Sequence, residues 1–386
     1  MGNVPPPPPP PPPAAGEITK RRKRTPTTVG EIAKRRKRNS EIKSWRSSLT
    51  NYIDSLPDEL LLRILLQLPA EDFYDAARFV SNKWRKLIRD FVREHLHRST
   101  PGLVVQSASL PPIFLTARLG RIEKLDFEYD FGEKWSSCNG LIVGFDATKN
   151  ALYVSNPEIK KRVSLPQSFH RMYGYGIAYA PASTEYKVVH SFLVANKTPH
   201  VQGCAVLTLG DDSSWRGLSI GHLSHASKHI LNCTPFTTEG FMHWTYGDYP
   251  RVLTLNVERE IITEQSIPDG CVGRSKYYFP TERSLTLLVE RSELSWDVWE
   301  LEPETGEWTK LPTIDLELQR DEFENSEKLP APIGWLNDKE VLVFQFFRTR
   351  RLLFLYNIRK RELEFLEVDY VCTLSHFYRS SLVWFG

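Results

Sequence analysis

A short phrase recurs in this sequence after residue 103: an apolar or aromatic run, a turn rich in Asn, Asp, Pro or Glu, and a second such run. Clear copies lie at 152–166, 252–268, 298–312 and 353–368, and weaker ones at 178–189 and 206–220. The turns at Asn256, Pro303 and Asn357 are 47 and 54 residues apart. Blades of a β-propeller repeat at about 50 residues, so the remaining length predicts about six blades. An irregular β-sandwich is the alternative.

Residues 56–92 have a helical period instead and predict three short helices. Acidic residues open the first helix, Pro69 ends it, and Ser81 is placed to cap the third. The apolar stripe of the first helix consists of Leu60, Leu61, Ile64, Leu65 and Leu68. Three helices of this length carry more apolar side chain than they can bury among themselves. We therefore expect the surplus to meet another domain or a partner.

Residues 1–46 form a proline-rich and basic tail that we expect to be disordered. They carry twelve Lys or Arg and three Glu, which is a net charge of +9. Because the whole chain has a net charge of +3, the other 340 residues have a net charge of −6. The tail holds two copies of one phrase, at 16–24 and 30–38. Clusters of this kind suit an import receptor, and nonspecific nucleic-acid binding is the alternative. The clustered cations are Lys20, Arg21, Arg22, Lys23, Arg24, Lys34, Arg35, Arg36, Lys37 and Arg38.

Composition indicates the type of fold and the cell compartment. Aromatic residues make up 12% of the chain, which favours β-structure. There is no run of eighteen apolar residues, so we expect no membrane span. The five cysteines are odd in number and far apart, and the proline-rich start does not look like a secretory signal. These features predict reduced thiols and a location in the nucleus and cytoplasm.

The helical stretch resembles an F-box. The matching residues are Leu56-Pro57-Asp58-Glu59, the leucine-rich helix, Leu68-Pro69, and Val80-Ser81 with Trp84. This resemblance implies docking onto the Skp-type adaptor of a cullin–RING ubiquitin ligase. The residues expected to make or support that contact are Leu56, Pro57, Leu60, Ile64, Leu65, Leu68, Pro69 and Trp84.

The β-rich region resembles the F-box-associated domain of plant F-box proteins, which is related in shape to kelch repeats. The likeness rests on Ser137-Cys138-Asn139-Gly140, Ser155-Asn156-Pro157, residues 173–189, residues 240–244, and residues 307–311 with Trp299. The resemblance implies a kelch-like propeller that binds a protein target. Candidate target-binding residues are Tyr246, Asp248, Tyr249, Tyr277 and Tyr278, although aromatic residues of this kind more often pack between blades.

Two further patterns suggest chemistry. Gly217-Leu-Ser219-Ile-Gly221 fits the nucleophile elbow of esterases, which requires a parallel sheet and a following helix. The surrounding pattern is all β, which argues against it. His222, His225, His229 and Cys233 have a spacing that places them on one side of a helix, as a zinc site would need. A polar connection between blades is the simpler interpretation, and we expect no metal, cofactor or catalytic residue.

The sequence therefore predicts a disordered tail at 1–46, a helical F-box domain at 47–100, and a propeller-like domain at 101–386. The expected function is that of a substrate-recognition subunit of a ubiquitin ligase. Its partners would be the Skp-type adaptor, through it the cullin and RING proteins, and an unidentified protein target. An adaptor-bound scaffold or an independent binding module is the alternative. No membrane and no specific nucleic acid is expected as a partner.

Overall fold

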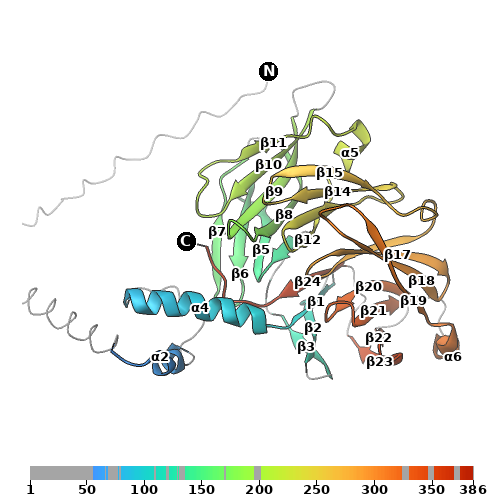
Figure 1. Cartoon of the computed structure of the whole chain (residues 1–386), viewed down its shortest axis with the longest axis horizontal. Coiled ribbons are helices and arrows are strands. Elements are labelled where there is room, and N and C mark those ends of the chain that lie inside the picture. The colour runs from blue at the N-terminus through green and yellow to red at the C-terminus, as the bar shows by residue number, and fades with distance from the viewer. Residues whose placement is uncertain are drawn as a thin grey trace, which may run out of the picture. The chain divides into compact units, whose positions relative to one another are not determined.

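The computed structural model describes most of the chain after residue 54 (Figure 1). The described residues are 55–65, 67, 77, 80–107, 110–118, 121–127, 129, 135–168, 171–194, 201–323, 330–346, 352–368 and 374–385. The tail predicted at 1–46, with both basic repeats, lies outside them. Within the described part, no helix is long and apolar enough to cross a membrane.

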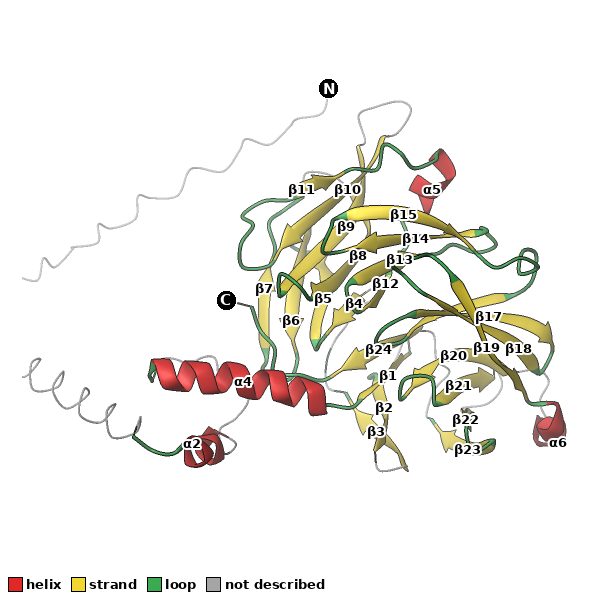
Figure 2. Ribbon diagram, in the orientation of Figure 1, coloured by secondary structure: helices red, strands yellow, loops and turns green. Residues whose placement is uncertain are grey.

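Strands dominate the fold and form six four-stranded antiparallel sheets, which are the blades of a propeller (Figure 2). Blade 1 consists of β24 (Leu374–Arg379), β1 (Pro101–Gln106), β2 (Ile113–Arg118) and β3 (Arg121–Asp126). Blade 2 consists of β4 (Trp135–Cys138), β5 (Leu141–Asp146), β6 (Ala151–Asn156) and β7 (Lys161–Ser164). Blade 3 consists of β8 (Arg171–Ala180), β9 (Glu185–Val194), β10 (Val201–Thr208) and β11 (Arg216–Leu218).

The other three blades follow the same order from first to fourth strand. Blade 4 consists of β12 (Phe236–Thr238), β13 (Phe241–Trp244), β14 (Arg251–Asn256) and β15 (Ile261–Ser266). Blade 5 consists of β16 (Lys276–Pro280), β17 (Leu285–Ser292), β18 (Ser295–Leu301) and β19 (Trp308–Asp315). Blade 6 consists of β20 (Pro330–Leu336), β21 (Val341–Phe346), β22 (Leu352–Asn357) and β23 (Glu362–Glu367). The predicted six-bladed fold is confirmed.

The first strands of the blades contact one another around a closed ring, in the order β4, β8, β12, β16, β20, β24 and back to β4. The ring closes through β24, which comes from the C-terminal end of the chain and pairs with β1 from Pro101↔Arg379 to Gln106↔Leu374. A hydroxyl links this strand to the next blade, because Ser137 Oγ donates to Phe377 O at 2.7 Å. Blade 1 is therefore assembled from two segments far apart in the sequence.

The four clear copies of the recurring phrase are the third and fourth strands of blades 2, 4, 5 and 6. Their turns share one backbone feature, a residue with positive φ just before the fourth strand or within two residues of it. These residues are Lys160 (51°), Glu260 (56°), Gly306 (77°) and Arg361 (58°). The weak copy at 206–220 is the corresponding part of blade 3, whereas the copy at 178–189 is the first strand pair of that same blade. That second copy is therefore not a separate blade.

Short helices accompany the sheets. They are α2 (Asp58–Leu65), α4 (Asn82–Arg98), α5 (His225–Ile230), η2 (Glu317–Gln319) and α6 (Arg320–Phe323). The predicted cap of the third F-box helix is confirmed, since Ser81 Oγ accepts from Trp84 N at 3.2 Å at the start of α4. The middle helix of the predicted three falls mostly on residues outside the described part.

The core of the propeller lies mainly between neighbouring blades. Blades 5 and 6 share an aromatic cluster in which Phe344 stacks on Phe354 with ring centroids 4.8 Å apart and Trp296 meets Phe344 at 5.2 Å. Blades 6 and 1 share an aliphatic cluster that includes Leu103, Val343 and Leu355. Because each sheet is apolar on both faces, the ring buries both faces of every blade against a neighbour.

Candidate protein-interaction surfaces

The two described F-box helices divide the predicted adaptor residues into buried and exposed sets. Leu61 and Leu65 of α2 are fully buried, as is most of Trp84 in α4, and helices α2 and α4 contact each other. Lys83 Nζ lies 2.9 Å from Asp58 Oδ1 and joins the starts of the two helices. Leu65 and Trp84 are therefore placed to support the helix pair rather than to contact a partner.

The exposed set lies on α2 and just before it. Leu60 and Ile64 are 44% and 41% exposed although both are large and apolar. They are four residues apart, so they lie one above the other on the helix surface. Pro57 is exposed and Leu56 half-buried. Leu68 and Pro69 lie outside the described residues, so their placement stays a prediction.

The five residues predicted to bind a target do not form one cluster. Tyr246 is 66% exposed in the loop between β13 and β14, and the exposed Asp248 of the same loop pairs with Lys276 of blade 5 at 3.1 Å. The half-buried Tyr249 packs on the blade 3–4 core, with its hydroxyl 3.3 Å from Ser227 Oγ. Tyr277 and Tyr278 of β16 pack against two apolar clusters, and burial raises the pKa of both. Only Tyr246 and Asp248 of the five are plainly available on the surface.

The boundaries between neighbouring blades, called seams here, differ in the polar contacts near their outer edges. Between blades 2 and 3, Trp215 Nε1 donates to Pro166 O at 2.7 Å, and three more seams carry short polar links between neighbouring blades. These are Lys187 and Arg216 to Glu260 at 2.9 and 2.8 Å, Lys339 to Glu300 at 2.6 Å, and Trp308 Nε1 to Ser266 O at 2.9 Å. The seam between blades 6 and 1 has a weaker link near its edge, from Lys124 Nζ to Glu367 O at 3.5 Å.

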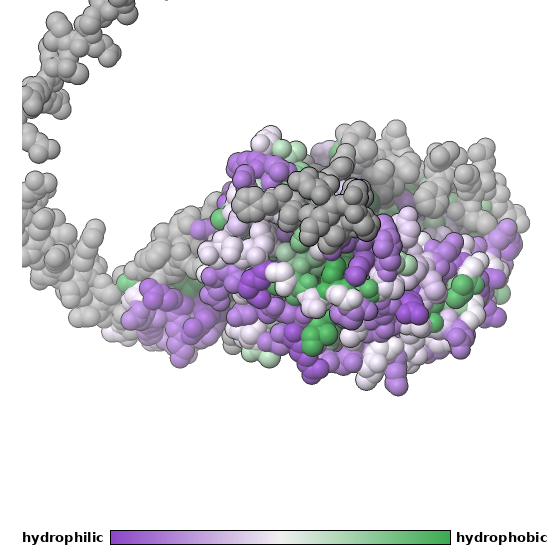
Figure 3. Space-filling model, turned by 90° about the horizontal axis from the view of Figure 1, so that it is seen from above, coloured by the Kyte–Doolittle hydropathy of each residue, from purple (hydrophilic) through white to green (hydrophobic). Residues whose placement is uncertain are grey.

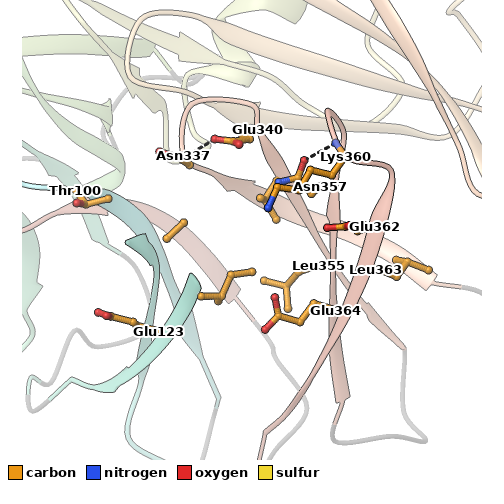
Figure 4. Close-up of a pocket in the computed structure, with 13 residues that line it drawn as sticks. Thr100, Glu123, Asn337, Glu340, Leu355, Asn357, Lys360, Glu362, Leu363 and Glu364 are labelled. Atoms are coloured by element: carbon orange, nitrogen blue, oxygen red, sulfur yellow. Dashed lines mark hydrogen bonds between the residues drawn. The ribbon is translucent and has the colours of Figure 1, made fainter. Parts of the chain in front are cut away.

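At that seam the structure has a groove of about 1050 Å³ between blade 1 and blade 6 (Figure 4). Its apolar lining includes Ile122, Val341 and Leu355, which belong to the core shared by blades 6 and 1, and also Ala117; the adjoining Leu363 packs on the blade 5–6 cluster. Glu123 and Thr100 approach from the blade 1 side, and Glu362 and Glu364 from β23 on the blade 6 side. We call this cleft the 6–1 groove.

The charge of the 6–1 groove is strongly acidic. Glu123, Glu340, Glu362 and Glu364 line it, against one cation, Lys360. Asn337 donates to Glu340, while the exposed carboxylates of Glu362 and Glu364 have no side-chain partner among the described residues. An apolar lining with an acidic edge suits a ligand that has both an apolar side chain and several positive charges.

A second cavity, of about 490 Å³, lies among the first strands of the ring. In its lining, Ser375 Oγ donates to Ile333 O between two first strands, and Trp335 Nε1 donates to Thr286 Oγ1 of β17 at 2.7 Å. Among the described residues, His376 Nε2 and Tyr278 Oη are in contrast buried without a hydrogen-bond partner. Burial there lowers the pKa of His376 to about 4, so its ring is neutral at pH 7 and lies 4.3 Å from the Trp135 ring.

The esterase-like and zinc-like patterns of the sequence lie between the start of β11 and the start of β12. Ser219 is exposed and follows β11, an antiparallel fourth strand of a blade, which is the wrong context for a nucleophile elbow. His222 Nε2 lies 2.8 Å from Ile262 O, and His225 meets the ring of His229 at 4.8 Å. Among the described residues these side chains do not form a group that could hold a metal.

The surface is mostly hydrophilic outside a few apolar places. On the face seen in Figure 3, apolar residues gather in one central patch surrounded by hydrophilic ones. The large apolar side chains with high exposure include Tyr246, Val272 and Leu318. These three residues are scattered singly over different elements, whereas Leu60 and Ile64 of α2 lie side by side.

Comparison with known proteins agrees with this arrangement. A family model described as "F-box domain" matches residues 53–96, and one described as "F-box associated beta propeller domain" matches residues 122–265. The putative F-box protein At4g17780 of Arabidopsis thaliana is 22% identical over 83% of this chain and 85% of its own. The F-box protein At5g49610 of the same plant is 23% identical over 67% of this chain and 79% of its own.

Among solved structures, a chain of the nidogen/laminin complex aligns with 73% of this chain and 99% of its own length at 11% identity, with a TM-score of 0.42. That likeness is too low to inform the function. The two family models, in contrast, match the helical region and residues 122–265 of the propeller, and the plant relatives span most of the chain. The chain thus carries matches to both family models and is similar to plant F-box proteins with an F-box-associated β-propeller domain.

Proposed function

We propose that this protein is the substrate-recognition subunit of an SCF-type cullin–RING ubiquitin ligase. The F-box docks on the Skp-type adaptor and through it on the cullin and RING proteins, and the propeller binds the protein to be ubiquitinated. The observation that carries the proposal is the exposed apolar pair Leu60 and Ile64 on a helix whose buried side is already satisfied by α4.

The proposed subunit works without catalytic groups of its own. It raises the effective concentration of target lysines beside the ubiquitin-charged partner, which is how a bivalent linker accelerates a reaction. The loop with Tyr246 and Asp248 is one candidate surface for the target. The basic repeats at 20–24 and 34–38 lie outside the described residues, and import into the nucleus is proposed for them from their composition alone.

Two alternatives use the same surfaces differently. An adaptor-bound scaffold or regulator would keep the F-box contact but deliver no target for modification. An independent binding module would use the propeller alone and leave the exposed pair on α2 without a partner. The exposed pair itself favours the adaptor-bound forms, because surface leucines that serve no partner are a solubility cost.

The decisive experiment measures binding of the full chain to a purified Skp-type adaptor by calorimetry. The double change Leu60→Asp and Ile64→Asp should abolish the complex, because two carboxylates would be buried without partners. The expected loss is ~3 kcal/mol or more, which is over a hundredfold in Kd.

Leu318→Asp is the matched control, since Leu318 is 91% exposed and lies in η2 after blade 5. This control should bind as tightly as the wild type. Circular dichroism should show all three chains folded, because each altered side chain is exposed. A wild-type chain that does not bind any Skp-type adaptor would contradict the proposal and favour the independent binding module.

A further inference from the structure

The 6–1 groove and the N-terminal tail have opposite charge and matching composition. The groove presents four glutamates and one lysine around an apolar lining. Each basic repeat of the tail has five consecutive cations and one isoleucine, Ile18 in the first and Ile32 in the second. A segment with one apolar anchor beside several cations is the kind of ligand that such a groove favours.

The size of the groove also selects a peptide. Its volume of about 1050 Å³ slightly exceeds the ~300–1,000 Å³ range usual for small-molecule sites. The groove runs along the exposed strand β23, where Glu362 and Glu364 are on one face and Leu363 lies between them on the other. An extended basic segment can therefore follow the strand and place several cations near successive carboxylates.

The N-terminal tail is long enough for its basic repeats to reach the 6–1 groove. Thr100, which lines the groove, comes two residues after the end of α4, and a 17-residue helix is ~25 Å long. Asp58 is fixed to Lys83 at the far end of α4 by the 2.9 Å ion pair. The 19 residues between Arg38 and Asp58 span up to ~65 Å when extended, well beyond that distance.

We propose that one of the two basic repeats of the tail docks in the 6–1 groove of its own chain. Tethering gives the tail a millimolar-range effective concentration at the groove, so even weak exposed ion pairs add up to a populated docked state. Docking of one repeat leaves the other available. The proposal does not depend on ligase activity, and it concerns the chain whether or not the F-box binds an adaptor.

Limited trypsin digestion of the full chain tests this docking, because the repeats are dense in trypsin sites and docking shields them. The test variant is Glu362→Gln with Glu364→Gln, which removes two exposed charges and keeps their size. Its tail should be cut ~3–10-fold faster than that of the wild type at low salt. At ~0.5 M salt, where the Debye length is only a few ångström, the two chains should be cut at the same rate.

The control is Asp211→Asn with Asp269→Asn, which removes two exposed carboxylates from other blades. Its tail should be cut at the wild-type rate, because the overall charge changes but the groove does not. Equal cleavage of the wild type and the groove variant at low salt would overturn the proposal, and so would equal acceleration in the control. Protection that falls on tenfold dilution of the protein would assign the groove to the tail of a second copy and overturn docking within one chain.

A direct readout locates the docked segment. Carbodiimide treatment of the wild type joins lysines to carboxylates that are in contact. Mass spectrometry should find Lys20, Lys23, Lys34 or Lys37 joined to Glu362 or Glu364 within one chain. Coupling of these lysines only to carboxylates outside the 6–1 groove would contradict the assignment.

Discussion

In blade 4, His243 connects side chains from all four strands. The ring is fully buried, with Nε2 3.0 Å from Thr238 Oγ1 of β12 and Nδ1 3.0 Å from Thr254 Oγ1 of β14. Thr254 Oγ1 in turn donates to Gln265 Oε1 of β15. Burial lowers the pKa of His243 to about 3, so the neutral ring is the form that holds the blade together.

This residue makes stability depend on pH. Because the folded pKa is about 3 and the ordinary value 6.5, the unfolded chain binds a proton below pH 6.5 that the folded chain does not. The contribution of His243 to the free energy of unfolding is therefore complete above pH 6.5. It falls by about 2 kcal/mol between pH 7 and pH 5. His376, with a folded pKa of about 4, adds a similar decline. Urea unfolding of His243→Leu should show lower stability at pH 7 but about half the decline toward pH 5.

The exposed His225 provides the comparison, since His225→Leu should keep the full decline. An unchanged pH dependence in His243→Leu would contradict the assignment. The sequence could not have predicted this role. The segment 240–244 was recognised only as part of a family likeness, whereas the burial and the threonine partners of His243 come from neighbouring strands.

At the scale of elements, the recurring phrase predicted the outer strand pairs well because a buried apolar strand, a polar turn and a largely exposed strand follow one another. The first strands of the blades were harder to predict, because they contact neighbours on both sides and carry no regular alternation. In β8, Gly174 shows why. A Cβ at this position would lie 2.0 Å from the backbone oxygen of Cys233, so this strand approaches the segment before β12 more closely than any side chain allows.

Gly174→Ala should therefore destabilise the protein by about 2 kcal/mol or more, since backbone must move to admit the methyl group. Gly217→Ala is the matched control, because nothing lies within 4 Å of a Cβ there and its φ is ordinary. That variant should change the free energy of unfolding by less than about 0.5 kcal/mol. Comparison of the urea unfolding midpoints of the two variants tests this prediction. Equal midpoints would show that blades 3 and 4 can move apart without a loss of stability.

At the scale of the whole molecule, six blades were predictable from length and period, but the closure of the ring was not. The pairing of β24 with β1 joins residues that are about 270 positions apart, and neither strand signals its partner. The same limit applies to the 6–1 groove. Glu123 comes from β3, Glu340 from the turn before β21, and Glu362 and Glu364 from β23, and the two blades meet only because the ring closes there.

A chain that ends at Val368 tests the importance of this closure. It lacks β24, so β1 loses its partner along six residue pairs and β20 and β4 lose a neighbour. We expect a lower urea midpoint, a broader transition and aggregation through the exposed edge of β1, measured by fluorescence and light scattering. A chain that lacks residues 1–46 should keep one sharp transition. A wild-type transition in the truncated chain would show that blades 2 to 6 are stable without closure.

Because blade 1 is built from two distant segments, its strands are synthesised at very different times. Strand β1 leaves the ribosome early, but its partner β24 is completed only at residue 379. At ~5–20 residues per second, the edge of β1 waits roughly 15–55 s for that partner. Throughout this interval the F-box helices have already been made, while the propeller is still open. The nascent chain therefore passes through a period in which the F-box helices are complete and the edge of β1 in the propeller is still unpaired.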